Sequence, residues 1–134
     1  MASVHREVLI HTPASQVWAA MRDVGALHTK LVPGFVTACI LDGQARLVTL
    51  ANGMQARELI VDVSEQLRRV SWSAVGGRLT HHNASAQVIE NGEQSCKVVW
   101  VADFLPNEMA PAISGMVEQG LKAMKLAQES HDAA

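Results

Sequence analysis

Residues 106–128 read PNEMAPAISGMVEQGLKAMKLAQ, and apolar side chains recur in this stretch every three or four positions. The apolar positions are Met109, Ile113, Met116, Val117, Leu121 and Met124, with the small Gly120 and Ala127 on the same track. Because an α-helix turns once every 3.6 residues, this spacing places them on one face of a helix. A helix of about six turns with one apolar face needs a large surface to lie on. The sequence therefore predicts a long carboxy-terminal helix, Pro106–Gln128, packed against the rest of the chain.

The rest of the chain reads mostly as strands. Apolar or alternating runs cover Val4–His11, Phe35–Leu41, Ala45–Leu50, Met54–Asp62, Arg68–Val75, Leu79–Glu90 and Ser95–Leu105. Pairs ending in glycine, such as Asp42-Gly43 and Asn52-Gly53, indicate hairpins because glycine takes the positive φ of tight turns. Two short helical segments follow the first strand, one carrying Val17, Trp18 and Met21 and one over Ala26–Lys30. We expect an α+β helix-grip fold, a curved seven-stranded antiparallel sheet around the long helix.

The faces of the last two strands decide which side chains meet the helix. In Leu79–Glu90 the more apolar alternate set is Thr80, His82, Ala84, Ala86 and Val88, and we place it inward. Two interpretations stay open for Ser95–Leu105. Its bulkier face carries Trp100 and Phe104, but a two-residue turn at Asn91-Gly92 would instead put Val101 and Asp103 on the side of His82. We favour the register set by the turn.

Length and composition limit the class of protein. The 134 residues, 49% hydrophobic and 18% charged, predict a single soluble domain over residues 1–134. A net charge of −2 gives no electrostatic reason to expect nucleic acid or an anionic membrane as partner. No apolar run is long enough for membrane insertion, and the amino end lacks the layout of a signal peptide. Cys39 and Cys96 lack metal or redox spacing, so we expect free thiols and a cytoplasmic protein.

The order of elements resembles the START-like, birch-pollen-allergen superfamily, which includes the bacterial polyketide cyclase/dehydrase and SRPBCC proteins. The residues that carry the resemblance are Pro13-Ala14-x-x-Val17-Trp18, Glu58 in the fourth strand, Val99-Trp100 in the seventh, and the terminal helix. It covers nearly the whole chain. The resemblance implies a cavity between sheet and helix.

A closer local likeness is to the plant abscisic-acid receptors, over the segment from Glu58 to Ala84 with its Gly-Gly turn and Arg-Leu-Thr sequence. By that likeness Glu58 and His82 point into a ligand cavity that Trp72 lines. Arg78 and Leu79 would sit at its mouth, and residues 51–54 would form a gate. The gate lacks the receptors' proline, and Thr37 stands where they carry a cavity lysine, so hormone binding is not implied.

Two residues are candidates for chemistry. A carboxyl such as Glu58, buried without a partner, would have a raised pKa and could act as acid, base or hydrogen-bond acceptor. His82 could orient a ligand or move a proton. Glu58 could equally face solvent or pair with Arg57 or Arg46, and His82 could be an ordinary core histidine. Neighbouring strand residues point to opposite faces, so His81 and His82 cannot share a metal ion, and we expect no metal and no cofactor.

Three functions follow from these patterns. The first is binding of a small, largely hydrophobic molecule, such as a lipid, polyketide or aromatic metabolite, without catalysis. The candidate ligand-binding residues are Glu58, Trp72, Ala74, Arg78, Leu79, His82, Ala84, Val101, Met116, Gly120 and Met124. The second is a cyclase or dehydratase that uses Glu58 and His82 as acid and base. The third is a protein-interaction module without a true cavity, and the sequence also leaves a homodimer open.

Overall fold

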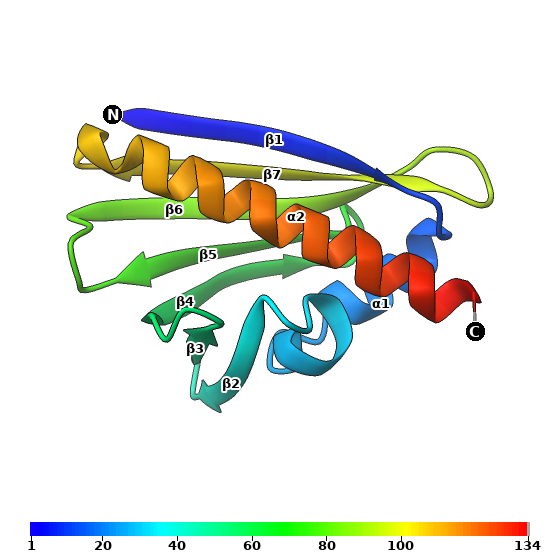
Figure 1. The fold of residues 1–134 in the computed structure, drawn as a ribbon, viewed down its shortest axis with the longest axis horizontal. Helices are drawn as coiled ribbons and strands as arrows, with labels where there is room; N and C mark the ends of the chain where they lie inside the picture. Colours follow the sequence, from blue (N-terminus) through cyan, green and yellow to red (C-terminus); the bar gives the residue numbers. More distant parts are fainter. Residues whose placement is uncertain (134) are drawn as a thin grey trace.

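A seven-stranded antiparallel sheet with helices over one face makes up the structure, a computed structural model (Figure 1). It describes the backbone of residues 1–133 and the side chains of residues 1–130. The strands are β1 (Ala2–Ile10), β2 (Val36–Asp42), β3 (Ala45–Leu50), β4 (Gln55–Ser64), β5 (Arg69–Val75), β6 (His81–Glu90) and β7 (Cys96–Leu105). The helical elements are α1 (Ala14–Met21), the π-helical turn η1 (Leu27–Leu31), the 3₁₀ turn η2 (Asn107–Met109) and α2 (Ala110–Ala133). The predicted helix-grip fold is confirmed.

The strand order is β1-β7-β6-β5-β4-β3-β2, so each strand pairs with its neighbour in sequence except β1, which pairs with β7. The predicted meander of hairpins produces this order. In Figure 1, α2 crosses one face of the sheet, and its carboxy-terminal part lies near α1 and η1. The two edges of the sheet are therefore β1 and β2, and η1 packs beside β2 whereas α1 contacts β6.

The apolar face of α2 is buried as its spacing predicts. Ile113, Val117, Leu121 and Met124 are all buried, whereas Lys122 on the opposite face is exposed. The end of α2 is held by polar contacts, since the buried Gln128 donates from Nε2 to the carbonyl of Lys30 at 2.8 Å. The hydroxyl of Thr12 donates to the carbonyl of Gln128 at 3.1 Å. No helix among residues 1–133 has the length and apolarity needed to span a membrane.

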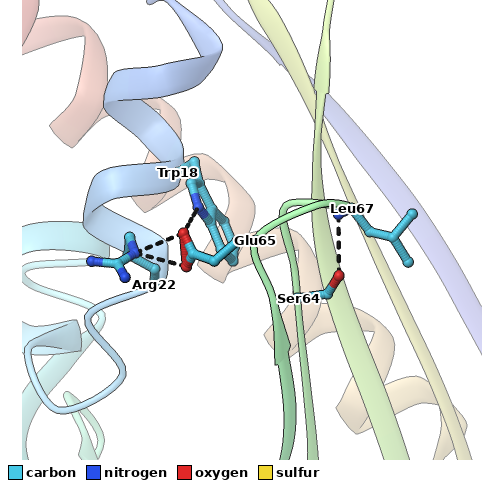
Figure 2. A network of polar contacts seen from close by, with 5 residues as sticks. All are labelled: Trp18, Arg22, Ser64, Glu65 and Leu67. Atoms are coloured by element: carbon cyan, nitrogen blue, oxygen red, sulfur yellow. Dashed lines mark hydrogen bonds and ion pairs between the residues drawn. The ribbon is translucent and has the colours of Figure 1, made fainter.

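A polar contact joins α1 to the turn between β4 and β5. Glu65 accepts a hydrogen bond from Trp18 Nε1 at 3.0 Å and one from Arg22 Nε at 2.8 Å, as Figure 2 shows. In the same turn Ser64 Oγ accepts from the N–H of Leu67 at 3.1 Å. The hydrogen bond from Arg22, followed by that from Trp18, lowers the pKa of Glu65. The buried indole of Trp18 thereby satisfies its N–H, and α1 is fixed against the sheet.

The register that we favoured for the last strand is wrong. His82 pairs with Phe104 and Ala84 with Ala102, so even-numbered residues lie beside even-numbered ones. The hairpin's last pair is Glu90 with Cys96, and the connection is residues 91–95 rather than a two-residue turn. The N–H of Asn91 donates to the carbonyl of Ser95 at 3.0 Å and closes this longer loop. Trp100 and Phe104 therefore face α2, and Val101 and Asp103 lie on the opposite face.

Candidate functional site

An apolar cavity of about 100 Å³ lies between α2, η1 and the inner face of the sheet. Its wall is built mainly from aliphatic and aromatic side chains, among them Leu27, Leu31, Val48, Val70, Trp72 and Trp100. Alternation along β3 and β5 aims these side chains inward, and the π-helical turn η1 adds two leucines from the side. Two charged side chains, Arg46 and Glu58, also line the cavity.

Arg46 and Glu58 form an ion pair in the cavity wall. They lie directly opposite each other on β3 and β4, both facing inward. Arg46 Nε donates to Glu58 Oε1 at 2.8 Å, and the side chains are only 4% and 17% exposed. Arg46 Nη1 donates to the carbonyl of Val24 at 3.1 Å. Of the two partners that the sequence left open for Glu58, Arg46 is the one it binds.

Two tryptophans lie beside the ion pair in the cavity wall. The guanidinium carbon of Arg46 lies 5.4 Å from the centre of the Trp72 ring, a cation–π distance. Trp72 in turn meets Trp100 edge to face, with ring centres 5.8 Å apart and an interplanar angle of 65°. The face of Trp72, itself in contact with Trp100, helps to hold the guanidinium in one orientation, so the position of the charge pair is well defined.

The pair is neutral as a whole but presents a donor next to an acceptor. Within residues 1–130, whose side chains the structure describes, Arg46 Nη2 and Glu58 Oε2 have no hydrogen-bond partner. A hydroxyl group of a bound molecule could satisfy either atom, and a carbonyl group could accept from Arg46 Nη2, whereas a charged group would disturb the balance of the pair. The arrangement can therefore orient one neutral polar group of an otherwise apolar molecule.

Five of the predicted site residues lie at this cavity. Glu58, Trp72, Met116 and Met124 line it. Gly120 stands behind two lining rings, since a Cβ placed there would come within 2.6 Å of Trp100 and 3.2 Å of Phe35. Periodicity predicts the inward face of β5 and α2, and the family resemblance implies the inward position of Glu58 on β4.

The other predicted site residues lie elsewhere. His82, Ala74 and Leu79 line a separate open hollow where the ends of β5 and β6 separate. Ala84 is buried in the sheet's inner face outside the cavity lining, and Arg78 is exposed in the connecting loop. Val101, predicted inward, pairs with His5 and Ser85 on the outer face because of the register described above.

His82 takes the place of a backbone acceptor where the β5–β6 ladder stops. The ladder ends at Trp72 and Ala84, and beyond it His82 Nδ1 accepts the N–H of Ala74 at 2.9 Å. The ring is 8% exposed, and burial, followed by the charge of neighbouring His81, lowers the pKa of His82. Accepting a backbone N–H at Nδ1 requires the neutral ring, so both observations favour the same state.

We expect the protein to lose stability on acidification because of His82. Its lowered pKa means that the folded state favours the neutral ring. The resulting contribution to stability is complete above the ordinary pKa of 6.5 and is lost as the pH falls through the lowered pKa of the folded state. Urea unfolding should show a loss of about 0.5–1.5 kcal/mol, the range of one hydrogen bond.

His82→Asn should remove most of that pH dependence, because its carboxamide oxygen can accept the N–H of Ala74 and does not titrate. The exposed His81 offers a matched control, and His81→Asn should keep most of the pH dependence. Equal slopes in the wild type and His82→Asn would show that His82 is not the responsible group.

Residues that the sequence analysis did not select include Arg46, Trp100 and Phe35, all of which line the cavity. Arg46 could have been found from the alternation of β3, where it shares a face with Val48 and Leu50. The bulkier face of β7 would have given Trp100. Phe35 precedes β2 and belongs to no periodic pattern, so no sequence signal marks it.

No group of three or more His, Cys, Asp or Glu side chains in the described part of the chain is placed to hold a metal ion.

The acid–base pair that the sequence suggested, Glu58 and His82, is not assembled in one pocket. Glu58 lines the cavity and His82 lines the other hollow, on strands β4 and β6 with Ala74 of β5 between them. Their backbones are therefore about 10 Å apart, two strand spacings.

A long helix held against a curved antiparallel sheet, with an apolar cavity between them, defines a helix-grip protein of the START-like superfamily. The family described as "Polyketide cyclase / dehydrase and lipid transport" matches residues 1–129, and the chain belongs to this family. The resemblance seen in the sequence is thus confirmed at the level of the superfamily.

Solved structures with the same fold come from varied proteins. An uncharacterised protein from Bacillus thuringiensis is 21% identical with a TM-score of 0.84, over 94% of this chain and 98% of that one. A norcoclaurine synthase mutant from Thalictrum flavum, in complex with a transition state analogue, is 17% identical with a TM-score of 0.75, over 98% and 96%. A di-domain ARO/CYC protein of the BE-7585A biosynthetic pathway is 16% identical with a TM-score of 0.80, over 95% and 46%. At these identities the likeness concerns the fold alone, and no curated protein matches the chain.

Proposed function

We propose that the protein binds a small, largely apolar molecule about the size of one aromatic ring, with one neutral polar group held at Arg46 and Glu58. The observation that carries the proposal is a single charge pair in the wall of an otherwise apolar cavity. Family membership supports it, because the family's description includes lipid transport and ring-forming enzymes. The norcoclaurine synthase neighbour was solved in complex with a transition state analogue, so a protein of this fold binds a small molecule.

The size of the cavity favours a ring over a lipid chain. A volume of about 100 Å³ approaches the roughly 150 Å³ of an engineered apolar cavity that admits benzene, so a single ring would require only a small movement of the lining side chains. A long acyl chain would require several lining side chains to move. Of the ligand classes expected from the sequence, the small aromatic metabolite therefore fits best.

Catalysis has less support from the geometry than binding does. Glu58 is held by Arg46 rather than buried alone, and His82 uses Nδ1 to accept a backbone N–H. The two groups also line different hollows, so they are not placed to act together as acid and base on one molecule in the cavity. A cytoplasmic location and a homodimer stay predictions from the sequence.

Phenol and toluene form a matched pair of probes, since they have nearly the same shape and differ in one hydroxyl. We expect both to bind, with a dissociation constant for phenol of about 1 mM or lower, a free energy attainable for seven heavy atoms. An NMR titration should shift the indole N–H signals of Trp72 and Trp100. The indole of Trp18, bound to Glu65 outside the cavity lining, serves as the internal control.

Glu58→Gln tests the polar contact, because it keeps the shape of the side chain and removes its charge. Phenol should bind the wild type about 5- to 100-fold more tightly than toluene, and this preference should fall several-fold in the variant, because a carboxamide oxygen is a weaker acceptor than a carboxylate. If saturating phenol and toluene leave Trp72 and Trp100 unshifted in folded protein, the cavity is not a binding site.

A further inference from the structure

A shallow groove runs over the surface just outside the cavity. The segment before β2, the β3–β4 connection and α2 form it, and its lining includes Gly34, Phe35, Ala51, Lys122 and Leu126. Leu126 is 62% exposed and extends the apolar lining of the groove along α2. The groove is thus apolar at its floor and lies against the outer surface of the wall that encloses the cavity.

Phe35 belongs to both spaces. It lines the groove outside and the cavity inside, so its half-buried ring is the partition between them. On α2 the partition meets Gly120, where Phe35 Cε2 lies 3.2 Å and Trp100 Cζ3 2.6 Å from the position that a Cβ would occupy. The missing side chain at Gly120 leaves the space into which the edges of these two rings fit.

The backbone of Phe35 is fixed by hydrogen bonds, whereas its side chain is held by packing contacts alone. Its N–H donates to the carbonyl of Val32 at 3.2 Å, and its own carbonyl accepts the N–H of Ala51 at 3.0 Å. These bonds fix the main chain on both sides of the residue. A change at this position therefore takes the form of a rotation of the ring about χ1, which needs no rearrangement of β2 or β3.

We propose that the Phe35 ring is the gate through which small molecules pass between the surface groove and the cavity. The identity of the molecules that pass through the gate rests on the proposed binding function. The position of the gate does not depend on it. The segment expected from the sequence to act as gate, residues 51–54, forms one side of this entrance through Ala51. The moving part is a single aromatic side chain, and the rest of the entrance is backbone and helix surface.

Exchange kinetics distinguish a gate from an ordinary wall residue. Phe35→Leu keeps an apolar group but shortens it, so phenol should enter and leave faster, both rates rising about tenfold with the dissociation constant changed less than about threefold. Line shapes of the Trp72 and Trp100 indole signals at several phenol concentrations yield both rates. Met124→Leu is the matched control, because Met124 lines the cavity but not the groove. It should change affinity without raising the association rate.

A second measurement needs no bound ligand. In a Trp18→Phe background the remaining tryptophans are Trp72 and Trp100, and acrylamide can quench them only by reaching the cavity wall or their exposed edges. Phe35→Leu should raise the quenching constant at least about twofold over Met124→Leu. Unchanged quenching would contradict the gate proposal. So would a rise in the dissociation rate of phenol without a rise in its association rate. Raised quenching without phenol or toluene binding would keep the gate and reject the proposed ligand class.

Discussion

Glu58→Leu is expected to lower the free energy of unfolding by about 3–5 kcal/mol, the usual effect of removing one partner of a buried ion pair. The reason is Arg46, whose side chain is only 4% exposed and would keep its charge without a carboxylate beside it. Its other contacts, the carbonyl of Val24 and the face of Trp72, cannot replace a full negative charge. Urea unfolding at constant m value measures the loss.

The double variant Arg46→Met, Glu58→Leu provides the control for this prediction. Removing both charges leaves an apolar wall of similar volume, so most of the stability lost in the single variant should return. A double variant as unstable as Glu58→Leu would show that leucine packs poorly at this position, and that the unpaired charge is not the cause. The same double variant should bind toluene but show no preference for phenol. That result would show that one pair of residues determines both the stability and the binding preference.

Gly120→Leu is expected to destabilise the protein by about 1–3 kcal/mol through overpacking. Even the first added carbon would lie 2.6 Å from Cζ3 of Trp100, and that ring is held on its other side by Trp72. The change should also push Phe35 outward, because its ring edge lies 3.2 Å from the same point.

Gly115, in the same helix, is the matched control. A Cβ at Gly115 would meet no atom within 4 Å, so Gly115→Leu should be neutral or stabilise by up to about 1 kcal/mol through helix propensity. Thermal unfolding of both variants checks the difference in sign. Equal losses at the two glycines would mean that α2 is not in close contact with the sheet at Gly120.

Much of the architecture could be predicted because it depends on local patterns. The stripe from Met109 to Met124 requires a helix with a partner surface, and glycine-containing turns between apolar runs require hairpins. Alternation also placed His82, Ala84 and Val88 inward, as observed. In the same way the inward positions of Trp72, Met116 and Met124 depend on periodicity within one element, whereas that of Glu58 was expected from the family resemblance.

The prediction failed where one loop sets the register of a whole strand. Asn91-Gly92 has the composition of a two-residue turn, but the connection runs over residues 91–95. Because side chains alternate with a period of two, this difference moved Trp100 to the inner face and Val101 to the outer one. The apolar bulk of Trp100 and Phe104, which gains more by burial than Val101 and Asp103, outweighs the local preference of the turn.

The amino-acid sequence by itself determined the order of elements, the antiparallel sheet and the amphipathic helix, because periodicity and turn chemistry act over a few residues. The tertiary structure alone decided that Arg46 neutralises Glu58, that His82 faces a separate hollow, and that Phe35 stands between groove and cavity. Each of these depends on side chains from different strands and loops meeting within a few ångströms. Such meetings follow from register, sheet curvature and the packing of the helix, and no short stretch of sequence contains them.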